Sequence, residues 1–289
     1  MTPRVVVVGD VAVDVLVEPA RQPVHGADVP ARIRTVPGGA GANTAAWLAH
    51  LGADVTLVAR VGADIAGREA ERELTAAGVR PVFTVDPDAA TATVVVLLGD
   101  DGERTMLSDR GAAARLRPAD LPSLGGTRHL HVAGHVLLDP ATRPAGLAAL
   151  AAARAAGAGT SVAAAAAPAV GAELRQWVGG VDLLLCNADE LRALSGSVEP
   201  SAAAVLDEVG ALVVTAGPDG ASWVTRAGTW HAPAPLVAVV DGTGAGDAFA
   251  AGLLVSRLAG ADPVAALAAG CAAGAAAVTR VGARPVTPR

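Results

Sequence analysis

Lysine is absent from this sequence of 289 residues, and all 22 of its basic residues are arginine. A Walker A loop places a lysine on the phosphates of its nucleotide, and a protein kinase needs one on a strand, so both classes are excluded. Enzymes that form an imine between a lysine and pyridoxal phosphate or a sugar are excluded for the same reason. Whatever chemistry the chain carries out must proceed without a lysine side chain.

Several other features are missing as well. Cys186 and Cys271 provide neither a disulfide framework nor a zinc spacing, which predicts a reducing compartment, the cytoplasm. The net charge is −6 and the sequence has no basic patch, so a nucleic-acid partner is not expected. Apolar runs are interrupted by Gly, Pro or Arg before they reach about 18 residues, so no membrane association is predicted. The residues after Met1 carry no signal-peptide pattern, and no targeting segment is expected.

What is present points to an α/β fold. Hydrophobic residues make up 52% of the chain and charged residues 17%, which is enough for a large core. Short β-branched runs bounded by turn residues predict buried strands at Val5–Val8, Val55–Val61, Leu130–Val132, Leu183–Cys186 and Leu212–Thr215. Helices are predicted at Thr44–Leu51, Ile65–Ala77, Ala145–Ala156, Asp189–Leu194, Asp247–Leu258 and Pro263–Val278. Their alternation with the strands predicts a mostly parallel sheet with helices on both faces.

A second, smaller sheet is predicted from four segments in which apolar and polar residues alternate. These segments are Val11–Val17, Ala31–Val36, Thr91–Leu98 and Arg104–Leu107, and the turn Gly99-Asp100-Asp101-Gly102 separates the last two. We interpret them as a lid formed from about residues 11–36 and 91–107. An exposed edge strand favours pairing with another chain, so a homodimer through the lid is a candidate assembly.

The strongest local signal is the run Val239–Phe249, which reads VVDGTGAGDAF. A strand end leads through a glycine-rich turn into an apolar helix, and the N–H groups at a helix start favour an anion. Asp247 at that position indicates a catalytic base that takes a proton from an attacking hydroxyl. The alternative is that Asp247 only caps the helix.

Two further motifs lie near the N-terminus. Val36–Ala45, which reads VPGGAGANTA, is a second glycine-rich turn that opens a helix. Its Asn43 either caps that helix or binds the hydroxyls of a polyol together with Gly38 and Gly39. Asp14 lies in an otherwise apolar stretch, so its carboxylate must be solvated, paired or bound to ligand hydroxyls.

Taken together, these motifs resemble the PfkB (ribokinase-like) family of carbohydrate kinases nearly end to end. The motifs at 9–14, 38–43, 61–67 and 241–247 follow the order and spacing of the family. The resemblance implies one ribokinase-like domain over residues 1–289, a three-layer α/β/α sandwich with a small β lid. It also implies transfer of the γ-phosphoryl group of ATP to a hydroxyl, usually the exocyclic CH₂OH of a sugar.

The resemblance also implies roles for individual residues. Asp247 would be the base, with Gly244, Ala245 and Gly246 as an anion hole, and Asp14, Gly38, Gly39 and Asn43 would hold the sugar. Asn187, Thr215, Gly217, Gly220 and Thr243 would contact the nucleotide, with Glu190 and Asp241 as the residues linked to metal. ATP and Mg²⁺ are the implied cofactors, and K⁺ is a candidate activator that the C-terminal region would bind.

The chain departs from the family pattern at positions that concern the sugar and K⁺. Ala40 replaces a lysine found in ribokinases, Leu138 replaces a sugar-binding carboxylate that Asp139 could supply, and Val286 replaces a hydroxyl residue of the potassium site. Arg110 could contact an acidic substrate or could be an ordinary loop arginine.

Three histidines, His129, His131 and His135, follow each other closely. A metal site is one interpretation of this cluster, and a strand end that faces the substrate, with His135 nearest to it, is the favoured one.

The sequence therefore predicts an ATP-dependent sugar kinase. A nucleoside kinase on the same fold is the first alternative, and the scarcity of aromatic residues, 2% of the chain, favours the sugar. A catalytically degenerate sensor of a sugar or nucleotide is the second, and the presence of Asp247 argues against it.

Overall fold

The main sheet spans the body of the molecule. The computed structural model describes residues 2–99, 104–165, 170–196 and 201–286. Nine of the described strands form one sheet in the order β13-β12-β11-β10-β9-β8-β1-β4-β5. The strands from β11 to β5 run parallel, and β12 and β13 are antiparallel additions at one edge. Their bounds are β1 Arg4–Val8, β4 Asp54–Gly62, β5 Val79–Asp86, β8 His129–Ala133, β9 Gly159–Ala163, β10 Leu183–Asn187, β11 Ala211–Thr215, β12 Ala221–Thr225 and β13 Gly228–Ala232.

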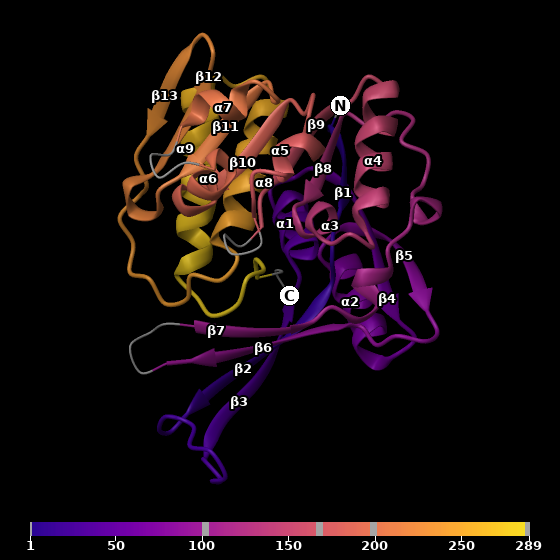
Figure 1. The fold of residues 1–289 in the computed structure, drawn as a ribbon, viewed down its shortest axis with the longest axis vertical. Helices are drawn as coiled ribbons and strands as arrows, with labels where there is room; N and C mark the ends of the chain where they lie inside the picture. The colour runs from indigo at the N-terminus through magenta and orange to yellow at the C-terminus, as the bar shows by residue number, and fades with distance from the viewer. Residues whose placement is uncertain (1, 100–103, 166–169, 197–200, 287–289) are drawn as a thin grey trace.

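Helices cover both faces of this sheet (Figure 1). The helices are α1 Ala40–His50, α2 Ile65–Ala76, α3 His135–Leu138, α4 Arg143–Ala155, α5 Leu174–Trp177, α6 Ala188–Ser195, α7 Ala202–Leu206, α8 Ala245–Leu258 and α9 Pro263–Val278. Short 3₁₀ turns lie at Gly111–Arg115, Pro118–Asp120 and Gly217–Asp219. None of the described helices is long and apolar enough to cross a bilayer.

The central strand β1 explains the layering. Successive side chains of a strand point to opposite faces, and all four valines of β1 are fully buried. Val5 and Val7 pack in a core with residues of α1, α2, α8 and α9, whereas Val6 and Val8 pack in a second core with residues of α3 to α7. A strand buried on both faces has an unbroken apolar sequence, which is why this one could be predicted. The three-layer α/β/α architecture is confirmed.

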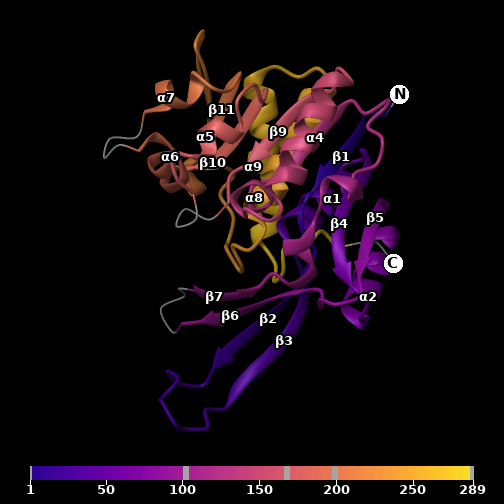
Figure 2. The same cartoon turned by 45° about the vertical axis from the view of Figure 1, so that its right-hand side comes forward.

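The second sheet is also confirmed, and it projects from one end of the body (Figures 1 and 2). It consists of β3 Ala31–Gly38, β2 Ala12–Pro19, β6 Ala92–Leu98 and β7 Arg104–Asp109, in that order. The predicted turn residues Asp100, Asp101 and Gly102 lie outside the described residues.

The chain passes from the main sheet to the small sheet through a tight junction after β1. Gly9 lies directly against Gly41 at the start of α1, because a Cβ on Gly9 would be 2.5 Å from the Gly41 Cα. Asp10 fixes this contact, since its Oδ1 accepts a hydrogen bond of 3.1 Å from the Gly41 N–H. The junction therefore brings β1, β2 and α1 together at the carboxyl ends of the parallel strands, where ligands bind in folds of this type.

Candidate active site

Two cavities meet at the N-terminus of α8. The larger, which we call the polar cavity, has a volume of about 610 Å³ and lies between the strand ends and the small sheet. The smaller, which we call the apolar cavity, has a volume of about 320 Å³ and lies between β11, α8 and α9. Ala245 and Gly246, the first two residues of α8, line both. A group transferred from a molecule in one cavity to a molecule in the other would pass this helix end.

The turn before α8 is shaped by Asp241 and Gly244. Asp241 Oδ1 accepts hydrogen bonds from the N–H and the hydroxyl of Thr243, at 2.9 and 2.7 Å, and its Oδ2 accepts one of 3.0 Å from the Gly282 N–H. Gly244 is the N-cap with φ of 76°, and a Cβ there would lie 2.5 Å from the Ala283 Cβ. Glycine is therefore required at position 244 for both conformation and space.

Asp247 lies in the first turn of α8 and lines the polar cavity. Its Oδ2 accepts a hydrogen bond of 3.0 Å from Asn43 Nδ2. Burial raises the pKa of Asp247 to about 7, and the charge of Asp10 adds to this, while the bond from Asn43 opposes it. Because the N-cap is Gly244, Asp247 does not cap the helix, and its carboxylate is left to face the cavity with a pKa suited to a base near neutral pH.

Three of the predicted sugar-binding residues line the same cavity. Asp14 on β2 and Asn43 on α1 are both buried and line it, as does Gly39. Burial is the main cause that raises the pKa of Asp14 to about 6. Gly38 lies behind Asp14, because a Cβ at Gly38 would be 2.1 Å from Asp14 Oδ1. Asn43 is inside α1, whose N-cap is Gly39, so its amide is not a helix cap.

Sequence reasoning missed several residues that line the polar cavity. Asp10 and Thr44 are the clearest, and they belong to the motifs at 9–14 and Val36–Ala45. Asp10 is the second residue after β1, and a polar residue just past a strand's carboxyl end is a signal that could have found it. Val94, Val96 and Met106 of the small sheet form an aliphatic wall of the cavity.

The histidine cluster is divided by the structure. His131 and His135 line the polar cavity, whereas His129 is buried beside them. His129 Nε2 and His131 Nδ1 each lie 2.8 Å from the Ser161 hydroxyl, which can donate to one ring and accept from the other. In the described part of the chain no group of three or more His, Cys, Asp or Glu residues could hold a metal ion. The metal interpretation of these histidines has no support.

The buried histidines predict a loss of stability in acid. Burial lowers the pKa of His129 to about 4 and that of His131 to about 3. The unfolded chain takes up protons below about pH 6.5 and the native chain does not, so the free energy of unfolding falls as the pH falls. We expect the stability advantage of the wild type over His129→Gln to shrink by about 2 kcal/mol between pH 7 and pH 5.

Urea unfolding of both proteins at the two pH values measures this change. The matched control is His25→Gln, which makes the same substitution at an exposed position. A constant difference for His129→Gln would show that this histidine is not held neutral by burial.

Asn187 and Glu190, predicted to contact nucleotide and metal, line neither cavity. They cap α6 at the end of β10 instead. Asn187 Oδ1 accepts a hydrogen bond of 2.8 Å from the Glu190 N–H, and Glu190 Oε2 accepts one of 2.9 Å from the Asn187 N–H. Burial raises the pKa of Glu190 to about 7. A cation beside its second oxygen would favour the charged carboxylate and offset this effect of burial. This fits Mg²⁺, which prefers carboxylate and water oxygens.

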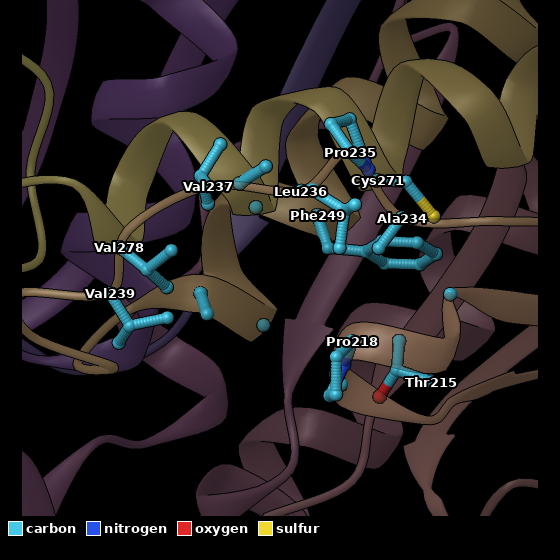
Figure 3. A pocket seen from close by; sticks show the side chains of 16 residues that line it. Thr215, Pro218, Ala234, Pro235, Leu236, Val237, Val239, Phe249, Cys271 and Val278 are labelled. Atoms are coloured by element: carbon cyan, nitrogen blue, oxygen red, sulfur yellow. The ribbon is translucent and has the colours of Figure 1, made fainter.

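The apolar cavity contains the remaining predicted nucleotide residues (Figure 3). Thr215, Gly217 and Gly220 line one side, and Figure 3 shows Phe249, Leu236 and Cys271 on the other. Gly220 has φ of 91°, and a Cβ there would lie 2.1 Å from the Ala232 carbonyl oxygen, so glycine is required. Flat apolar walls of this kind suit a purine base, and the helix end beyond them suits the attached phosphates.

The chain is similar to known proteins over nearly its whole length. The model of the pfkB family carbohydrate kinase matches residues 2–289. A fructokinase from Klebsiella pneumoniae is 34% identical over 316 residues, which cover 100% of this chain and 97% of the relative.

Two solved structures share the fold throughout. Aminoimidazole riboside kinase from Salmonella enterica, complexed with aminoimidazole riboside and an ATP analog, has a TM-score of 0.83 at 29% identity. The match covers 99% of this chain and 96% of that one. A protein from Escherichia coli in complex with ATP and Mg²⁺ has a TM-score of 0.84 at 25% identity, with 97% of this chain and 94% of that one covered.

Proposed function

This chain belongs to the pfkB family of carbohydrate kinases, and from that premise we propose that it phosphorylates a hydroxyl group of a small neutral sugar with ATP. The observation that carries the proposal is the meeting of the two cavities at Ala245 and Gly246, with Asp247 one residue further along α8. ATP occupies the apolar cavity and the sugar occupies the polar one. The exocyclic CH₂OH is the group proposed to react.

The reaction needs one proton acceptor and one anion site. A carboxylate oxygen of Asp247 takes the proton of the sugar hydroxyl while the hydroxyl oxygen of the sugar forms a bond to the γ-phosphorus. The bond from the γ-phosphorus to the bridging oxygen breaks, and ADP leaves. The backbone N–H groups of Gly244, Ala245 and Gly246 stabilise the charge on the transferring group, which replaces the missing lysine.

The metal assignments remain part of the proposal. Glu190, with Asn187 beside it, would hold Mg²⁺ through water, and the ion would neutralise phosphate charge. Asp241 is proposed as a second residue linked to a cation, although the hydrogen bonds to Thr243 and Gly282 already take up part of its accepting capacity. K⁺ binding near Val286 stays a prediction.

The charge of the polar cavity favours a neutral acceptor. Asp10, Asp14 and Asp247 line it, and no arginine does among the described residues. Arg110 is not among the lining residues and forms an ion pair with Asp139, its Nε 3.6 Å from Asp139 Oδ2. A sugar acid or sugar phosphate would bring a further negative charge towards three carboxylates, whereas neutral hydroxyls can donate hydrogen bonds to them.

A nucleoside is the second candidate acceptor, and one observation favours it. The aliphatic wall of Val94, Val96 and Met106 faces the polar wall, so the cavity can accept a molecule with a sugar and an apolar base. These side chains come from β6 and β7, which supports the proposal that the small sheet acts as a lid that excludes water from the reaction.

A coupled ADP-release assay tests the proposal. Mg-ATP is supplied with pentoses, hexoses, nucleosides, sugar acids and sugar phosphates at equal concentrations. We expect the highest kcat/KM with a neutral sugar and at least about tenfold lower values with its acidic counterparts, which is the effect of one unfavourable charge contact. Preference for a nucleoside would select the second candidate. No acceptor-dependent turnover would contradict the kinase proposal and favour the sensor.

A further inference from the structure

The segment after α9, residues 279–286, contacts three parts of the proposed active site: the turn before α8, the helix α1 and Gly38 at the end of β3. Gly282 N–H donates to Asp241 Oδ2, and Ala283 packs against Gly244 in the turn before α8. The Ala283 carbonyl oxygen accepts a buried hydrogen bond of 2.9 Å from Trp47 Nε1 on α1. These contacts fix the backbone of the segment. They place the following residue, Arg284, beside the glycine-rich turn around Gly38, which we call the acceptor loop.

Arg284 is a largely buried cation, and its side chain is 12% exposed. Its Nη2 donates a hydrogen bond of 2.9 Å to the Gly38 carbonyl oxygen, and its Nε donates one of 3.4 Å to Asn43 Oδ1. Its Nη1 lies 3.6 Å from Glu73 Oε2 on α2. A buried charge is retained only where it is paired and hydrogen-bonded. Here the forked guanidinium group of Arg284 contacts three elements, β3, α1 and α2.

We propose that Arg284 is a positioning residue that orients Asn43 towards Asp247 and holds the Gly38 loop around the sugar. The Asn43 amide has one accepting and one donating end. Arg284 occupies the accepting end, Oδ1, so the donating end, Nδ2, is directed at Asp247 Oδ2. A flipped amide would place Oδ1 against a carboxylate, which repels it. Asn43 thereby fixes the Asp247 carboxylate through its Oδ2, and the carboxylate faces the sugar hydroxyl.

This role rests on the proposed function, because it assumes that Asp247 is the base. Arg284 lies 241 positions from Asn43 in the sequence and belongs to none of the motifs. Its two contacts should also affect kinetics differently. The Asn43 contact acts on the base and therefore on kcat, whereas the Gly38 contact acts on the acceptor loop and therefore on the acceptor KM.

The test is a double-mutant cycle in the acceptor-dependent ADP-release assay. We expect Arg284→Met to lower kcat by about tenfold or more, to raise the acceptor KM a few-fold, and to leave the KM for ATP unchanged. In an Asn43→Ala background, the same change should alter kcat by less than about twofold and still raise the acceptor KM.

Arg280→Met is the matched control, because Arg280 lies in the same segment but over the Trp47 ring, 6.0 Å from its centroid. Its kcat should stay within about twofold of wild type. If Arg284→Met does not fold, Arg284→Lys, which keeps the charge and loses the fork, takes its place in the cycle, with the same pattern expected.

Three outcomes separate the claims. A wild-type kcat for Arg284→Met, or equal kcat losses with and without Asn43, overturns the positioning role. An active Asp247→Asn protein in the same assay overturns the assignment of Asp247 as the base, whereas the absence of acceptor-dependent turnover in the wild type overturns the proposed function. A loss of kcat that disappears in the Asn43→Ala background, with Asp247→Asn inactive, supports both.

Discussion

The Asp247→Asn protein is expected to lose phosphoryl transfer by a factor of about 10² or more, as befits the removal of a general base. The variant keeps the size of the side chain and a partner for Asn43 Nδ2, which lies 3.0 Å from the Asp247 oxygen, so the geometry of the cavity should persist. Steady-state ADP release with the best acceptor measures kcat, and titration with ATP measures donor binding, which should not change.

The pH dependence identifies the group. Burial raises the pKa of Asp247 to about 7, so wild-type kcat/KM should fall as the pH falls through about 7 and the carboxylate becomes protonated. The residual activity of Asp247→Asn should lack this acid limb. Asp207→Asn, which changes an exposed carboxylate paired with Arg226, is the control and should behave as wild type.

Folding must be checked in the same variant. The raised pKa means that the native state holds a proton between about pH 4 and pH 7 that the unfolded chain has released. The charged carboxylate therefore destabilises the fold above pH 7. Asp247→Asn should be more stable than wild type at pH 8, by about 1–3 kcal/mol after allowance for screening in the open cavity, and the difference should vanish near pH 4. Turnover at the wild-type rate would mean that another group is the base.

The second large effect is expected at Gly244, where alanine should unfold the turn before α8. Its φ of 76° is strained for alanine, and the new methyl would lie 2.5 Å from the Ala283 Cβ. We expect the free energy of unfolding to fall by about 2–4 kcal/mol, together with a loss of activity.

Gly246→Ala is the matched variant two residues away. A Cβ there meets no atom within 4 Å, so the protein should fold, with a stability that is unchanged or raised by up to about 1 kcal/mol. The methyl group would nevertheless occupy the boundary of the two cavities, and kcat should fall by about tenfold or more. Urea unfolding and ADP release separate the two effects. Equal losses of stability in both variants would contradict the structural account of this turn.

The family resemblance and the three-layer fold could be predicted because their signals are local. The apolar run Val5–Val8 requires a strand buried on both faces, and the glycines of Val239–Phe249 require a turn that opens a helix. The family match over residues 2–289 confirms the resemblance, and the sheet order confirms the fold. The strand β5 was missed because exposed residues and Pro81 interrupt its pattern. The antiparallel strands β12 and β13, at the opposite edge, were missed too.

The composition of the site could be predicted only in part. Asp14, Asn43 and Asp247 lie in motifs, and the structure brings them into one cavity. The contact between Arg284 and Asn43 joins residues 241 positions apart, and no local pattern encodes it. A Glu and an Asn three residues apart have the same spacing in a capping box and in a metal motif, so Glu190 could not be assigned to one of the two from sequence.

The most direct test of the account is the ³¹P NMR spectrum of the product made from Mg-ATP and the best neutral sugar. The proposed reaction should give ADP and a phosphate monoester in equal amounts. The phosphorus of the ester should couple to the two protons of one CH₂ group. Release of inorganic phosphate in place of that ester would contradict it, because the terminal phosphoryl group would then have been transferred to water.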